Sequence, residues 1–174
     1  ATLDLPGFGY GINYQYGLFQ QEIRDGYQVE KPDNWLARGT PWLLTRNEPP
    51  LFVPLYGRVE HTREGGRDRA LWRDTVAVKG IPADMPIVGW GGRTVNRLRL
   101  YTAQASTEFD MGIFNEGDYL RAVEQKMTSE TISKVLYPSD AVAAGRELRL
   151  VQEYFLVACA LGDIFRRFLA AGHD

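Results

Sequence analysis

The chain has 174 residues, of which 44% are hydrophobic and 24% are charged, values that exclude a disordered or fibrous protein and predict one domain with a substantial core. Twenty basic and 22 acidic residues give a formal charge of -2, which argues against nucleic acid or anionic lipid as a partner. One cysteine and two histidines cannot form a disulfide framework or a four-ligand zinc site, and no apolar run approaches the ~20 residues of a membrane span. We expect a cytoplasmic protein without a metal site.

The first predicted strand lies in residues 9–19, GYGINYQYGLF, whose side chains alternate between two faces. One face carries aromatic and branched side chains, at Tyr10, Ile12, Tyr14 and Tyr16. The other has glycine at three of five positions, so either a ligand or another backbone fits against it. A dinucleotide loop is disfavoured because a strand, rather than a helix, follows the glycines.

The first 105 residues as a whole read as strands and loops. Turn-forming residues cluster at 24–27, 30–34, 47–50 and 63–68, and the clearest further strands are 51–62, 72–80 and 94–104. A glycine-containing hairpin loop is expected in this region. In the last strand Leu98 and Leu100 share a face opposite Arg97 and Arg99, so one face is predicted to pack and the other to carry charge.

Helices are predicted from Asn115 onwards, where the hydrophobic period changes. A capping-box-like start precedes a helix over 115–127, and a short helix over 128–136 follows it. The longest helix covers about 146–169, with one apolar stripe formed by Leu150, Tyr154, Val157, Leu161, Ile164 and Phe168. Further apolar positions widen the stripe, so we expect much of this helix to be buried.

Individual residues leave several interpretations open. Cys159 is predicted to be inert core, and four tryptophans are expected in the core more often than as sugar platforms. Arg166 and Arg167 either complement the helix dipole or form a fork for phosphate. Asp140 is either a solvated turn residue or the polar tip of a mobile gate.

Several longer motifs occur in one order along residues 1–169. They are "GYGINYQYGLFQQEIRDGYQVEKPDNWLARGTPW", "YGRVEHT", "VNRLRLYTAQA", "FDMGIFNEGDYLRAV", "ISKVLYPSD" and "GRELRLVQEYFLVACALGDIFRRF". Together they closely resemble the α-glucan phosphorylases, the family of glycogen, starch and maltodextrin phosphorylases. The resemblance implies phosphorolysis, in which inorganic phosphate cleaves a terminal α-1,4 glucosyl unit of a glucan and releases glucose 1-phosphate.

The resemblance also implies a fold and a cofactor. Family members are homodimers with two Rossmann-like domains of the glycosyltransferase B type, and their pyridoxal phosphate is bound by a lysine of the C-terminal domain. The chain would be an α/β fragment, a single partial domain from the middle of the N-terminal domain, without the catalytic C-terminal domain. A recombinant fragment, a proteolytic remnant and a truncated gene are the simplest accounts. We expect no catalytic residue, no bound cofactor and no activity in the chain alone, and a stand-alone glucan-binding or regulatory module is the main alternative.

The family's gate loop beside the substrate pocket matches LYPSD, residues 136–140. Asp140 keeps the acid of the family's Asp-Asn pair, but Ala141 stands where the amide is expected. Val142 stands where an aromatic residue is frequent in the animal enzymes. The chain therefore departs from the family's gate loop at these two positions.

The effector site of the regulated animal members, which binds the phosphate of AMP or glucose 6-phosphate, matches at three arginines. Arg166 and Arg167 match its paired arginines, and Arg99 matches a further one. Another expected arginine appears as Ala37, with Arg38 next to it. Control of the animal kind is therefore not expected.

Overall fold

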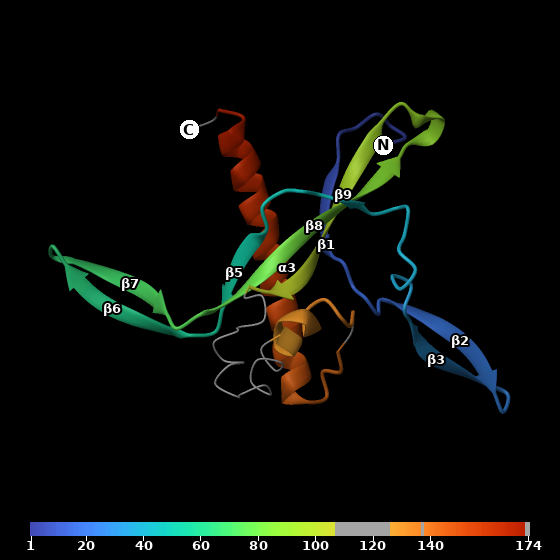
Figure 1. Cartoon of the computed structure of the whole chain (residues 1–174), viewed down its shortest axis with the longest axis horizontal. Coiled ribbons are helices and arrows are strands. Elements are labelled where there is room, and N and C mark those ends of the chain that lie inside the picture. The colour runs from blue at the N-terminus through green and yellow to red at the C-terminus, as the bar shows by residue number, and fades with distance from the viewer. Residues whose placement is uncertain (107–125, 137, 173–174) are drawn as a thin grey trace, which may run out of the picture.

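The computed structural model of this chain describes residues 1–106, 126–136 and 138–172. A sheet forms its centre, two hairpins project from the sheet, and one long helix crosses it (Figure 1). The elements are β1 (Phe8–Ile12), β2 (Leu18–Arg24), β3 (Tyr27–Asp33), β4 (Leu44–Thr45), β5 (Leu51–Leu55), β6 (Arg58–Glu64), β7 (Arg67–Arg73), β8 (Val76–Val88), a 3-10 turn (Trp90–Gly92), β9 (Val95–Ala105) and α3 (Ala143–Ala170). This mixture of sheet and helix confirms the α/β character.

The central sheet has the order β1-β9-β8-β4, and β5 also pairs with β8. β1 runs parallel to β9, whereas β8 runs antiparallel to β9, β4 and β5. Helix α3 packs on this sheet through β5 and β1. The buried core between them includes Val53, Val78, Tyr101, Phe155 and Cys159. Burial raises the pKa of Cys159 to about 12, in line with an inert core thiol.

Two hairpins, β2-β3 and β6-β7, extend away from the sheet (Figure 1). Asp25 and Gly26 connect the first, with φ of 50° and 81°, and Gly65 and Gly66 connect the second, with φ of 59° and 80°. Two consecutive positive φ angles match the tight turn that suits the twist of a hairpin. The predicted turns at 24–27 and 63–68 are thus confirmed. The predicted turn at 30–34 is wrong, because β3 continues through most of it.

Three predicted strands are interrupted, and the one expected over 72–80 breaks after Arg73, at Asp74, whose φ is 57°. The strand expected over 9–19 ends at Ile12, and the one expected over 51–62 breaks at Tyr56 and Gly57, whose φ angles are 60° and 76°. A Cβ at Gly9 or Gly11 would lie 3.0 or 2.9 Å from the side chain of the partner leucine on β9. The leucine side chains of β9 therefore fill the space beside these glycines, which leaves no room there for a ligand.

The charged face of β9 is exposed at Arg97 but buried at Arg99, contrary to the expected division of that strand. Arg99 lies in the interior, on the same face as Tyr101 and Ala103, whereas Leu98 and Leu100 are only half-buried. Alternation identifies which residues share a face but not which face the helix covers. Three of the four tryptophans were also mispredicted, since Trp42, Trp72 and Trp90 are exposed in this chain, whereas Trp35 is half-buried.

Helix α3 confirms the predicted long helix but not its expected burial. The six residues of the predicted stripe are 40% to 66% exposed. The buried line is instead Gln152, Phe155, Cys159 and Asp163. Only one side of α3 meets the sheet, and the apolar stripe stays largely exposed apart from an edge-on contact between Tyr154 and Trp72 of β7. Residues 126–131 are also helical, whereas most of the helix predicted over 115–127 lies outside the described residues.

Candidate functional site

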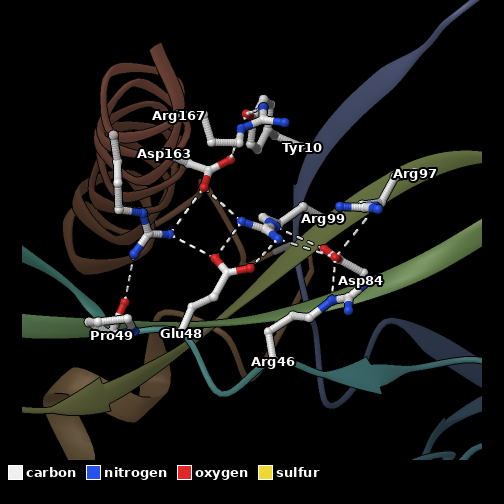
Figure 2. Close-up of polar contacts among 10 residues, drawn as sticks. Tyr10, Arg46, Glu48, Pro49, Asp84, Arg97, Arg99, Asp163 and Arg167 are labelled. Carbon is white, nitrogen blue, oxygen red and sulfur yellow. Dashed lines mark hydrogen bonds and ion pairs between the residues drawn. The ribbon is translucent and has the colours of Figure 1, made fainter. Parts of the chain in front are cut away.

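A cluster of arginines and carboxylates lies between the sheet and the C-terminal half of α3 (Figure 2). Arg99 of β9 is at its centre, with a side chain only 2% exposed. Its Nε donates a hydrogen bond to Asp84 at 2.8 Å, and its Nη1 donates to Asp163 at 2.7 Å. Nη1 and Nη2 each donate to Glu48 at 2.9 Å. One guanidinium group thus connects β8, α3 and the segment between β4 and β5.

The sheet register fixes the first of these pairs, because Asp84 lies directly opposite Arg99 in the β8-β9 ladder. Asp84 also accepts a hydrogen bond from Arg46 at 2.6 Å and lies 3.7 Å from Arg97. Burial alone would raise the pKa of Asp84, but the hydrogen bonds from Arg99 and Arg46 outweigh it and hold this pKa below its usual value. Asp84 is therefore a buried carboxylate that stays ionised.

Asp163 performs the corresponding role on α3, where its side chain is fully buried. Arg166 and Arg167 follow it by three and four residues, and both contact it at 3.1 Å. This spacing places the three side chains on one side of the helix. Asp163 therefore holds both guanidinium groups toward the sheet.

Arg166 and Arg167 differ in their other contacts. Arg166 donates to Glu48 and to the backbone oxygen of Pro49, both at 2.9 Å. Arg167 donates to the Tyr10 hydroxyl at 2.6 Å and lies over the Phe8 ring, 3.9 Å from its centre. Arg166 thus faces the segment before β5, whereas Arg167 faces β1.

Positive charge exceeds negative charge in the arginine cluster, which we define by its ion-paired members. These are Arg46, Arg97, Arg99, Arg166, Arg167, Glu48, Asp84 and Asp163. Five guanidinium groups against three carboxylates leave a net charge of two positive units. Guanidinium groups suit phosphate because they donate parallel hydrogen bonds and remain protonated. The cluster is therefore suited to binding an anion.

The gate-loop residues lie far from the arginine cluster, at the other end of α3. Val142 precedes the first residue of the helix, and roughly 35 Å of helix separates Ala143 from Arg166. Asp140 is 71% exposed and accepts a hydrogen bond from Arg149 at 3.0 Å, and the Ala141 amide donates to Ser139 Oγ at 3.4 Å. The structure brings the three candidate arginines together but not the gate residues with them.

Sequence reasoning missed several members of this cluster. Asp163 could have been found from its i, i+3 and i, i+4 spacing to the two arginines. Glu48 and Asp84 carry no local signal, because their partners come from distant segments. Ala37, where a further arginine was expected, instead lines a separate cleft of about 290 Å³. Arg46 contributes a guanidinium group that the sequence had not suggested.

Other kinds of site have little support in the described parts of the chain. No group of three or more potential metal-ligating side chains is found there. No helix in the described parts of the chain is both long enough and apolar enough to cross a membrane.

Comparison with known proteins gives one consistent result. A family model described as carbohydrate phosphorylase matches residues 1–174. The liver form of glycogen phosphorylase from Bos taurus is 49% identical over 174 residues, which is 100% of this chain and 20% of that protein. The human liver form is 50% identical over 171 residues, and glycogen phosphorylase from Synechocystis is 48% identical over 171 residues. Each of these two alignments covers 98% of this chain but only 20% of the relative. The chain therefore spans about a fifth of the length of these relatives.

Proposed function

Because the chain belongs to the carbohydrate phosphorylase family, we propose that it works as part of an α-glucan phosphorylase. That enzyme would use inorganic phosphate to release glucose 1-phosphate from the terminal α-1,4 unit of a glucan. The observation that carries the proposal is the match along the whole chain to glycogen phosphorylases from organisms as different as Bos taurus and Synechocystis.

The proposal includes a place for the chain within that enzyme. The sheet crossed by α3 would belong to the N-terminal Rossmann-like domain of a glycosyltransferase B fold, in a cytoplasmic homodimer that takes glucan and inorganic phosphate. The exposed apolar side of α3 supports this placement, because such a surface is normally covered in a folded protein.

Pyridoxal phosphate, which the family uses, does not fit the residues of this chain. A lysine that forms a Schiff base is activated by desolvation or by a neighbouring cation. The four lysines, Lys31, Lys79, Lys126 and Lys134, all lie in described parts of the chain, and none is buried. Lys31 contacts a carboxylate, Glu22, at 2.7 Å. The cofactor would therefore be held by residues of the enzyme outside these 174.

Within the enzyme, Arg99, Arg166 and Arg167 would bind the phosphate group of a sugar phosphate or nucleotide. Their convergence and the excess positive charge of the arginine cluster support this role. Asp140 and Ala141 would contribute a substrate-side loop at the other end of α3. Because Ala141 lacks a side-chain amide, the loop could offer substrate only the carboxylate of this pair.

The test is phosphorolysis by the natural gene product that contains these residues. It should release glucose 1-phosphate from glycogen or maltodextrin only when both glucan and orthophosphate are present. The 174-residue chain assayed alone should release none. Retention of the natural product on a glucan affinity gel without phosphorolysis would instead favour a glucan-binding module.

A further inference from the structure

Glu48 differs from the other two carboxylates of the arginine cluster. Asp84 and Asp163 are 1% and 0% exposed, whereas the Glu48 side chain is 37% exposed. Glu48 nevertheless accepts three hydrogen bonds of 2.9 Å, two from Arg99 and one from Arg166. It is thus the carboxylate of the cluster that both bridges two arginines and reaches solvent.

We propose that the Glu48 carboxylate is the internal occupant of an anion site formed by Arg99 and Arg166, and that a phosphate dianion or phosphate monoester binds there by displacing it. The inference rests on the proposed phosphate-binding role of these arginines and adds a residue that regulates it. Asp84 and Asp163, being buried, stay in place and hold Arg99 during the exchange.

The geometry permits this exchange without a change of the neighbouring backbone contact. Arg166 also holds the segment through the Pro49 backbone oxygen at 2.9 Å. That bond does not involve the Glu48 side chain, which can rotate into water through its own torsions. The vacated space faces guanidinium nitrogens from β9 and from α3, an arrangement that matches several oxygens of one phosphate.

Charge counting predicts which anions can displace Glu48. With Glu48 in place the cluster carries two excess positive charges, and with Glu48 turned outward it carries three. A monoanion in the vacated site restores the excess to two, which gives no advantage over Glu48. A phosphate with nearly two negative charges lowers the excess to about one. The site should therefore select dianions over chloride or acetate.

Glu48→Gln tests the proposal because it preserves shape and removes only the competing charge. Glu22→Gln is the matched control. Glu22 also bridges two cations, Lys31 at 2.7 Å and Arg24 at 3.1 Å, and its side chain is 31% exposed. Both variants change the net charge equally, but Glu22 lies on the β2-β3 hairpin, outside the arginine cluster.

The measurement is calorimetric titration of the chain and its variants with inorganic phosphate and with glucose 6-phosphate. Glu48→Gln should bind both ligands about tenfold more tightly than the unmodified chain, which corresponds to ~1.4 kcal/mol of binding free energy. Glu22→Gln should match the unmodified chain, and adding Arg166→Ala to Glu48→Gln should abolish the gain. Chloride and acetate should bind the unmodified chain more weakly than either phosphate ligand, because a monoanion gains no charge advantage over Glu48.

Two results would overturn the inference in different ways. Equal phosphate affinity in Glu48→Gln and the unmodified chain, with binding still lost in Arg166→Ala, would reject competition by Glu48 but keep the phosphate role of the arginines. No binding by any of these proteins would reject both.

A measurement on the unmodified chain covers the case in which Glu48→Gln fails to fold. Phosphate titration followed by nuclear magnetic resonance should shift the side-chain Nε–Hε signals of Arg99 and Arg166. The Glu48 carboxyl signal should move toward its solvent-exposed value at the same phosphate concentrations. An unchanged Glu48 signal while the arginine signals shift would contradict the displacement.

Discussion

Replacing Asp163 by asparagine isolates the contribution of a buried carboxylate to stability. Asp163 is fully buried and accepts hydrogen bonds from Arg99 at 2.7 Å, from Arg166 at 3.1 Å and from the Tyr10 hydroxyl at 2.9 Å. It also forms an ion pair with Arg167 at 3.1 Å. Removing one partner of a buried ion pair costs about 3–5 kcal/mol. Arg99 keeps Asp84 and Glu48, and the other two arginines are partly exposed, so we expect the lower figure of about 3 kcal/mol.

Urea denaturation measures this loss directly. With a slope of about 2 kcal/mol per molar, a loss of about 3 kcal/mol lowers the midpoint by roughly 1.5 M without changing the slope. Asp140→Asn is the control, since Asp140 is 71% exposed and pairs only with Arg149 in the ion pairs described, and it should cost less than about 0.5 kcal/mol. Equal midpoints for Asp163→Asn and Asp140→Asn would refute the assignment of Asp163 as a structural anchor.

Three further predictions concern other residues of the arginine cluster and a contact in the core. In the natural gene product, the double substitution Arg166→Ala, Arg167→Ala should weaken binding of AMP or glucose 6-phosphate by about tenfold or more, because hydrogen bonds to charged groups contribute ~1.5–3 kcal/mol each. Unchanged affinity in calorimetric titration would contradict this prediction. The pKa of Asp84 is lowered in the folded chain, so its contribution to stability is present above its unfolded pKa of about 3.9 and is lost as pH falls through the folded value. In Asp84→Asn, the free energy of unfolding measured with urea should therefore vary less with pH below about pH 4. A Cβ at Gly80 would lie 2.5 Å from the Cys159 sulfur, so Gly80→Ala should lower the free energy of unfolding by about 1–3 kcal/mol. Adding Cys159→Ala should recover part of this loss, and additive losses in thermal unfolding would reject the contact.

Local features of the fold were predictable from the sequence because their causes are local. The Asp25-Gly26 and Gly65-Gly66 pairs specify their turns through the φ angles that glycine permits. The long helix was predictable from its apolar period, and its extent agrees with α3 within a few residues. The break at Tyr56 was missed, because a non-glycine residue with positive φ has no reliable sequence signal.

The arginine cluster was predictable only in part, because its geometry depends on long-range pairing. The resemblance identified Arg99, Arg166 and Arg167, and the helical spacing of Asp163 could have extended that set. The pairing of Asp84 with Arg99 depends on the register of β8 against β9. Glu48 enters the cluster through the path of the chain between β4 and β5, which no periodic pattern specifies. Such contacts become visible only when the segments are placed in space.

The pairing of β1 with β9 has a consequence for how the chain folds. β1 lies beside a strand from the far end of the β-rich half, and the Gly7 amide donates to the Asn96 side chain across 89 positions in sequence. During synthesis β1 therefore cannot acquire its native neighbour until β9 has left the ribosome. Closing so large a loop is entropically costly and slow. Until then the aromatic face of β1 is a site at which chaperones would bind the nascent chain, well before α3 has been made to cover it.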